Sequence, residues 1–177
     1  DKKNTPGLIM KTSGAGFSVI DRESILSKIN SVRQTIKGEL PNVYFMHGDF
    51  TDEQMNELYN HPKVKAHINL THGEGFGRPL LEASMSQKPV IASDWSGHKD
   101  FLPKDLAVLV PGSLTDVPKE SFPKDMHIPG TQWFTCNYQQ TSRIMKDVFE
   151  NYRNYKLNAK KLTIGNKSKF SLDEMTK

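Results

Sequence analysis

Cysteine and long apolar runs are what this sequence most clearly lacks. Cys136 is the only cysteine among 177 residues, which excludes an internal disulfide framework and any multi-cysteine metal site. No run approaches the roughly 18 apolar residues that a membrane span needs, and the start, DKKNTPG, has no apolar signal-peptide core. We therefore expect a cytoplasmic protein without a membrane anchor.

A concentrated positive charge is also missing. The formal net charge is +4, but lysine and arginine are scattered, with only a loose enrichment over residues 156–169. A nucleic-acid-binding protein gathers its positive charge on one surface and places aromatic residues among it. The sequence therefore predicts no nucleic-acid partner, and a small polyanionic ligand fits the charge better.

The length of 177 residues predicts one globular domain. Near the end, Ser171 and Glu174 have the spacing of a capping box, in which the side chains of the two residues bond reciprocally to backbone donors at a helix start. A helix that starts so late is expected to continue, and the chain does not begin with Met. We interpret the sequence as a fragment of a longer protein.

Strand and helix patterns alternate along most of the chain. Ile25, Ile29, Val32 and Ile36 recur at helical spacing, and Thr51 with Gln54 predicts the start of a second helix. Further helices are predicted near Pro79 and from Tyr138. The predicted strands cover residues 8–10, 43–46, 65–71, 90–93 and 106–110. This alternation is typical of an α/β fold with a doubly wound, Rossmann-like parallel sheet.

Ligands of such folds bind outside the carboxyl ends of the strands. The segments that follow the predicted strands are therefore expected to contact a ligand, namely residues 11–17, 47–51, 71–78 and 94–99. Residues 111–136 hold Pro111, Pro118, Pro123 and Pro129, which predict an irregular excursion rather than long regular elements.

Residues 71–82 form the most informative of these segments. Gly73, Gly75 and Gly77 permit close backbone approach, and Pro79 suits the first turn of a helix. The exposed N–H groups and the positive end of the helix dipole make a phosphate site, which the dipole alone would favour by about 0.3 to 2 kcal/mol. Arg78 would add a charge-assisted contact to that phosphate.

Two carboxylates flank this phosphate site. Glu82 lies about one turn into the predicted helix, whereas Glu74 lies in the loop before it, so their roles should differ. A carboxylate gains about 1.5 to 3 kcal/mol per charged hydrogen bond, which suits Glu82 to the ribose hydroxyls of a nucleotide. Glu74 would then face whatever group lies beyond the phosphates.

The stretch GEGFGRPLLEAS resembles the E-x7-E signature of the retaining glycosyltransferases of family 4 (group 1) and their relatives, which have the two-domain GT-B fold. Glu74 and Glu82 occupy its two acidic positions. Flanking features agree, with a hydrophobic strand before it and KPVIAS and SGHKDFL after it. The resemblance implies that this chain is the carboxy-terminal, donor-binding domain, and that an amino-terminal acceptor domain of the same protein is absent.

The resemblance also implies roles for individual residues. Glu74 would face the transferred sugar as the catalytic residue, and Glu82 would hold the ribose. The backbone of Gly75, Phe76 and Gly77 would receive the pyrophosphate and sugar. Lys11 and Arg78 would neutralise the diphosphate, although the second basic residue that the family often has after the first strand is missing. His47 and Gly48 correspond to the region that lines the base pocket.

The same resemblance implies a nucleoside-diphosphate sugar as substrate, no cofactor and no metal. The histidines show no metal-ligand spacing such as HExxH. The acceptor would be a glycan or a lipid-linked glycan, and the fragment alone should bind the donor without transferring sugar.

Other interpretations stay open at this stage. A GT-B epimerase that acts on the nucleotide sugar itself shares the architecture, and so does a non-catalytic interaction module. His72 and His98 are more typical of structural positions than of ligand contacts, and Trp95 and Trp133 are expected to pack. The SGAG at residues 13–16 lacks the third glycine of a dinucleotide-binding fingerprint.

Overall fold

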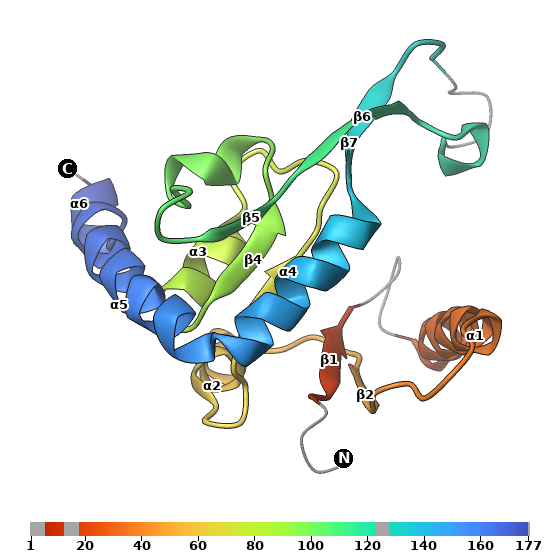
Figure 1. Cartoon of the computed structure of the whole chain (residues 1–177), viewed down its shortest axis with the longest axis horizontal. Coiled ribbons are helices and arrows are strands. Elements are labelled where there is room, and N and C mark those ends of the chain that lie inside the picture. Colours follow the sequence, from red (N-terminus) through yellow and green to blue (C-terminus); the bar gives the residue numbers. More distant parts are fainter. Residues whose placement is uncertain (1–5, 13–17, 123–127, 177) are drawn as a thin grey trace. The chain divides into compact units, whose positions relative to one another are not determined.

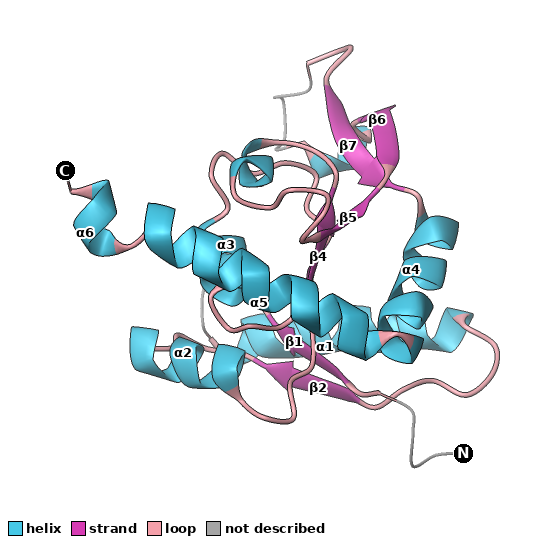
Figure 2. Ribbon diagram, turned by 60° about the vertical axis from the view of Figure 1, so that its left-hand side comes forward, coloured by secondary structure: helices cyan, strands magenta, loops and turns pink. Residues whose placement is uncertain are grey.

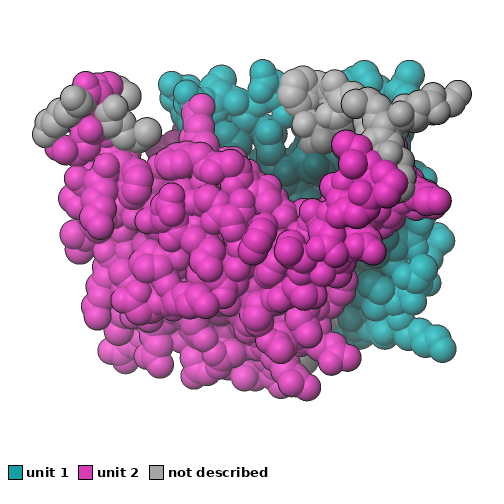
Figure 3. All heavy atoms as spheres, turned by 90° about the horizontal axis from the view of Figure 1, so that it is seen from above, with its two compact units in different colours: residues 1–55 teal, residues 56–177 magenta. Residues whose placement is uncertain are grey.

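The computed structural model describes residues 6–12, 18–122 and 128–176. The chain forms two compact units, unit 1 over residues 1–55 and unit 2 over residues 56–177 (Figure 3). The single domain that the length predicts stays a prediction.

Unit 1 is a strand–helix–strand arrangement. Strand β1 (Leu8–Lys11) pairs in parallel with β2 (Val43–Met46), and Leu8 lies opposite Val43. Helix α1 (Val19–Thr35) connects them, and Asp21 N donates to the hydroxyl of its N-cap, Ser18, at 3.1 Å. These elements confirm the predicted alternation in this part of the chain. Within residues 6–12 and 18–55, no side chain is fully buried.

Helix α2 (Asp52–Asn60) begins with the predicted capping box. Gln54 N donates to Thr51 Oγ1 at 3.3 Å, and Thr51 N donates to Gln54 Oε1 at 3.0 Å. The two side chains thus satisfy two backbone donors that a helix start leaves without partners.

Unit 2 has a parallel sheet in the order β3-β4-β5. The strands are β3 (His67–Asn69), β4 (Val90–Ser93) and β5 (Val108–Val110), and helix α3 (Arg78–Ser84) connects the first two (Figure 1). Helices α4 (Tyr138–Glu150), α5 (Tyr152–Lys169) and α6 (Leu172–Met175) follow. The predicted α/β class with parallel strands is confirmed. Among the described residues, the parallel strands form a two-stranded sheet in unit 1 and a three-stranded sheet in unit 2.

The prediction of an irregular excursion over residues 111–136 is wrong. This segment contains an antiparallel pair of strands, β6 (Gly112–Asp116) and β7 (Gln132–Cys136). A short 3-10 helix, η3 (Lys119–Ser121), follows β6. Pro111, Pro118 and Pro129 lie outside both strands, so their missing N–H groups break no bond of the ladder. Pro123 lies outside the described residues.

Strand β4 divides the core of unit 2 into two clusters. Its side chains alternate, so Val90 and Ala92 pack in one cluster with Leu80 and Phe101, whereas Ile91 packs in the other. The second cluster also holds Val110, Phe134, Cys136 and Val148. A strand whose residues are all buried is typical of the centre of a parallel sheet covered on both faces.

Helix α5 packs against α3 through polar side chains, and the sequence analysis did not predict it. Thr163 Oγ1 donates to Ser84 O at 2.7 Å, and Asn166 Nδ2 donates to Ser84 Oγ at 2.8 Å and to Phe101 O at 3.1 Å. All three polar residues are buried. Figure 2 shows α5 beside α3. In the part of the chain that the structure describes, no helix is both long and apolar enough to cross a membrane.

We predict that Asn166→Ala destabilises unit 2 by about 1 to 3 kcal/mol, because it leaves buried hydrogen-bond partners unsatisfied. Urea unfolding followed by circular dichroism would measure the change. The matched control is Asn154→Ala, an exposed asparagine of the same helix, which should change the free energy of unfolding by less than about 0.5 kcal/mol. Equal effects of the two variants would contradict a stabilising role for the buried network.

His67 is a half-buried titratable group of unit 2. Its Nε2 lies 3.2 Å from Ser86 Oγ, and its ring lies edge-on to Tyr59 with centroids 5.3 Å apart. Burial, and then the positive charge of Lys88, lower its pKa from 6.5 to about 4. His67 is therefore neutral in the folded protein at pH 7.

This histidine should make unit 2 less stable in mild acid. Between pH 6.5 and about 4, the unfolded chain binds a proton at His67 that the folded chain does not. The free energy of unfolding should therefore fall by about 2 kcal/mol between pH 7 and pH 5 through this residue alone. Urea unfolding at both pH values would show a smaller fall for His67→Gln. The same fall in both proteins would rule out His67 as the source.

Candidate active site

The loop between β3 and α3, residues 70–77, carries most of the predicted site. Thr71 Oγ1 donates to Gly73 O at 3.0 Å and accepts from Gly73 N at 3.3 Å, which closes the first turn. Gly77 is the N-cap of α3 with φ +86°, and its carbonyl accepts from Leu80 N at 2.9 Å and Leu81 N at 3.1 Å. A left-handed N-cap explains the glycine before the helix.

A second loop, which follows β4, holds the first in place. Ser96 Oγ accepts from Glu74 N at 3.0 Å and donates to Glu74 O at 2.6 Å, and Gly97 N donates to Glu74 O at 3.1 Å. A Cβ atom at Gly97 would lie 1.9 Å from Gly75 O, so only glycine fits. The loops meet because β3 and β4 are adjacent parallel strands whose carboxyl ends share one edge.

Ser96 has a backbone conformation that non-glycine residues rarely adopt. Its φ is +82° and its ψ is −171°, a region that costs of order 1 to 3 kcal/mol. The same residue makes both side-chain hydrogen bonds to the backbone of Glu74. The strain is therefore located where the position of Glu74 is fixed.

Glu82 lies on the first turns of α3 and already has two partners. Arg78 Nε lies 2.5 Å from Glu82 Oε1, with the Arg78 side chain 71% exposed and that of Glu82 35% exposed. Burial, the charge of Glu82 and a hydrogen bond to Glu82 raise the pKa of Tyr59 to about 12, against the opposing charge of Arg78. Tyr59 and Arg78 therefore both hold the carboxylate that was predicted to bind ribose. The contact of Arg78 with phosphate stays a prediction.

The other predicted residues of this loop differ in exposure. Glu74 is half-buried and its backbone is held by Ser96. The Phe76 ring, 40% exposed, packs near Phe101 and Phe170, with centroid distances of 5.3 and 6.3 Å. The side chain of Phe76 thus belongs to an aromatic cluster, and the predicted role of its backbone is untested.

His72, within the first loop, and His98, in the second, both have structural contacts, as their positions predicted. His98 is fully buried and its Nε2 lies 2.7 Å from Ser93 O. His72 Nδ1 lies 2.6 Å from Phe134 O, and its ring stacks on Trp133 at a centroid distance of 3.8 Å. Trp95 stacks on Phe134 at 5.7 Å, which confirms that both tryptophans pack. His72 therefore ties strand β7 to the loop that carries Glu74.

Asp94, the first residue after β4, forms ion pairs with two lysines. Its carboxylate lies 2.7 Å from both Lys99 Nζ and Lys104 Nζ. Burial would raise the pKa of Asp94, but the hydrogen bonds and charges of the two lysines lower it overall. Among the described residues, no group of three or more His, Cys, Asp or Glu is placed to hold a metal ion; reaction without a metal stays a prediction.

Lys11, His47 and Gly48 lie in unit 1. Lys11 Nζ lies 5.2 Å from the centroid of the Phe50 ring, and His47 Nε2 lies 2.7 Å from Asp21 Oδ2. Gly48 has φ +126°, which explains glycine at that turn. Their predicted contacts with the diphosphate and base stay predictions, and residues 13–17 of the same predicted ligand segment lie outside the described residues.

Three residues that shape this site, Tyr59, Ser96 and Gly97, are not individually predicted from the sequence. Ser96 and Gly97 lie in residues 94–99, which are predicted as a ligand-contacting segment because they follow a predicted strand. No local pattern predicts that Ser96 bonds to a loop 22 residues away. Tyr59 has the helical spacing of a core position, which carries no signal of a contact with Glu82.

Comparison with known families bears on the same segment. The family model described as glycosyl transferases group 1 matches residues 30–118, half of the chain, and this range includes both loops of the candidate site. No curated protein matches the chain. The family match supports glycosyl transfer as the general activity. The chain belongs to the group 1 glycosyltransferases.

Proposed function

We propose that this chain binds the nucleoside-diphosphate sugar of a retaining glycosyltransferase through the loop between β3 and α3. The observation that carries the proposal is the double hydrogen bond of Ser96 to the backbone of Glu74. It fixes a carboxylate-bearing loop at the carboxyl end of a parallel strand, where ligands of this fold class bind. The family match supports the general activity.

Glu82 would hold the ribose of the donor. A carboxylate that accepts from ribose hydroxyls gains about 1.5 to 3 kcal/mol per bond, and Tyr59 and Arg78 already restrict the Glu82 side chain. Pre-positioning of this kind lowers the entropy cost of binding. Exchange of the Arg78 contact for a phosphate contact would free one carboxylate oxygen for the ribose.

Glu74 would face the sugar that is transferred. The bond from the anomeric carbon to the diphosphate would break, with its electron pair leaving on the diphosphate. A bond to the acceptor oxygen would form on the same face of the ring, and the proton of that hydroxyl would pass to the departing diphosphate. The backbone of Gly75, Phe76 and Gly77 would stabilise the departing diphosphate. The acceptor, a glycan or a lipid-linked glycan, would be bound mostly by an amino-terminal domain, and the reaction would take place in the cytoplasm without a metal.

Calorimetric titration of the chain with UDP, GDP and ADP, compared with NAD and inorganic phosphate, tests donor binding. We expect one nucleoside diphosphate to bind best, and Glu82→Ala to weaken it by about tenfold or more, because the ribose loses its charged acceptor. The matched control, Glu57→Ala, removes an exposed glutamate of α2 and should leave the affinity unchanged. Equal affinity for all five compounds, or no effect of Glu82→Ala, would refute the proposal.

Two variants of Ser96 separate its hydrogen bonds from its strain. Ser96→Ala and Ser96→Gly both remove the two hydrogen bonds from the Ser96 side chain to the backbone of Glu74. Both should weaken binding of the donor nucleotide several-fold. Glycine adopts φ +82° without strain, so Ser96→Gly should be more stable than Ser96→Ala by about 1 kcal/mol. Calorimetric titration and urea unfolding give the two quantities. Unchanged affinity for the nucleotide in both variants would show that the hydrogen bonds of Ser96 to Glu74 do not contribute to binding.

A further inference from the structure

We propose that a pocket at the base of the β6–β7 hairpin binds an uncharged oligosaccharide. The pocket has a volume of about 610 Å³ and is formed by the two strands and the start of α4, all within unit 2. This volume falls in the range of about 300 to 1,000 Å³ that is typical of small-ligand sites. Binding of an oligosaccharide at this pocket does not depend on the proposed function, whereas the use of that oligosaccharide as the acceptor does.

The lining of the pocket is polar and neutral. Hydroxyls come from Ser113, Thr115 and Thr135, and amides from Asn137 and Gln140. Among the described residues that line the pocket, none is charged at neutral pH. Hydroxyl and amide groups both donate and accept hydrogen bonds, which matches the hydroxyl groups of a sugar and gives no charge to hold a phosphate or a carboxylate.

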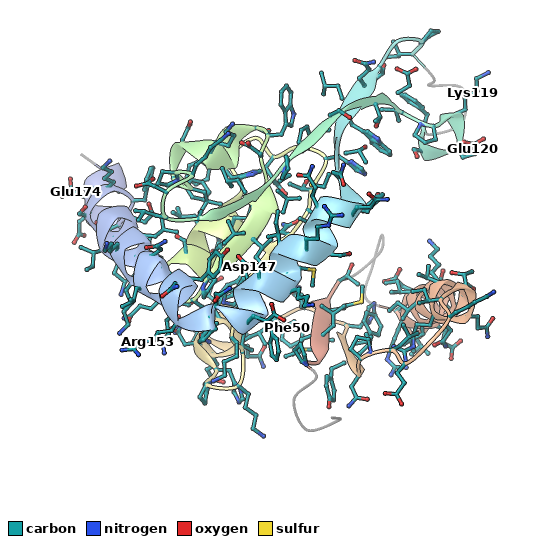
Figure 4. All side chains as sticks on the ribbon, viewed as in Figure 1. Phe50, Lys119, Glu120, Asp147, Arg153 and Glu174 are labelled. Atoms are coloured by element: carbon teal, nitrogen blue, oxygen red, sulfur yellow. The ribbon has the colours of Figure 1, made fainter. Side chains whose placement is uncertain are left out.

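The charged residues of the hairpin are not among those that line the pocket. The nearest in sequence, Asp116, follows the pocket residue Thr115 in β6, and its Oδ1 accepts from Gln132 Nε2 at 2.9 Å. Figure 4 shows Lys119 and Glu120 at the far end of the arm from α4. The base of the arm is thus chemically distinct from its tip. A charged ligand would lose hydration free energy at the base of the hairpin, because no residue that lines the pocket carries an opposite charge to pair with it. A neutral ligand avoids this cost.

Tyr138 supplies an aromatic face at the pocket. It is the first residue of α4, and its side chain is 70% exposed. A tyrosine offers a flat apolar ring with a polar hydroxyl at its end. This combination suits a pyranose ring, whose faces carry C–H groups and whose edge carries hydroxyls.

The hairpin connects this pocket to the loop of Glu74. Ser113 pairs with Thr135, and Thr115 pairs with Trp133, so the pocket side chains and Trp133 share one face of the hairpin. Thr115 Oγ1 and Thr135 Oγ1 are 2.7 Å apart on that face. Successive residues of a strand are about 3.3 Å apart, so the backbones of Trp133 and Thr135, two residues apart, are separated by about 6.6 Å. This distance is about the length of one sugar ring.

Trp133 in turn stacks on His72, with ring centroids 3.8 Å apart, and His72 precedes Glu74 by two residues. An oligosaccharide seated at Tyr138 would therefore extend along one face of the hairpin toward the reacting sugar. We assign the pocket to a distal sugar of the acceptor chain. The sugar that receives the transferred group would lie beyond Trp133.

Saturation-transfer NMR of the chain with neutral trisaccharides of glucose, mannose, galactose and N-acetylglucosamine tests this proposal. At least one should bind, and Tyr138→Ala should weaken it by about tenfold. The matched control is Tyr44→Ala, because Tyr44 is an exposed tyrosine of unit 1, and it should bind the trisaccharide as the unaltered chain does. A surface meant for a protein partner would bind none of the four, which would overturn the proposal, as would binding that is insensitive to Tyr138→Ala.

The same variants distinguish this inference from the proposed function. Tyr138→Ala should leave nucleoside-diphosphate affinity intact, and Glu82→Ala should leave trisaccharide affinity intact. Trisaccharide binding in a chain that binds no nucleoside diphosphate would sustain the pocket and refute the donor site. Circular dichroism of each variant confirms that a loss of binding is not a loss of folding.

Discussion

The close backbone approach of two loops governs the candidate site. Gly97 lies so near Gly75 that any side chain at residue 97 would displace the loop, and Ser96 then bonds both backbone groups of Glu74. Adjacent parallel strands bring the loops to one edge of the sheet. Glu74 is thus positioned by backbone geometry before any ligand binds, which is the arrangement that preorganised sites require.

The elements that could be predicted from sequence are those determined by local rules. The apolar run of β4, the capping box of α2 and the glycine and proline around the start of α3 each specify local structure directly. The same rules identified the segment that contains Glu74 and Glu82, and the family match covers it. They also predicted parallel strands, because helices alternate with them.

The remainder depends on contacts between distant segments, which no local pattern encodes. The partner of Glu82 on α2 is Tyr59, 23 residues earlier, and its helical spacing was typical of a core position. Helix α5 was missed because its buried face includes Thr163 and Asn166, which a search for apolar periodicity passes over. The β6–β7 hairpin is not predicted because four prolines in residues 111–136 indicate irregular structure, although Pro111, Pro118 and Pro129 lie outside the two strands.

The bond between Ser84 and Asn166 spans 82 residues of sequence. A ribosome that adds about 5 to 20 residues per second needs roughly 4 to 16 s to synthesise that interval. Once Phe101 has been synthesised and until Leu162 follows, β3, α3 and β4 exist without α5, and Leu80, Val90 and Phe101 lack the Leu162 side chain that joins their cluster. The nascent chain therefore exposes an apolar surface for seconds, and a chaperone that binds such surfaces would act between the synthesis of α3 and that of α5.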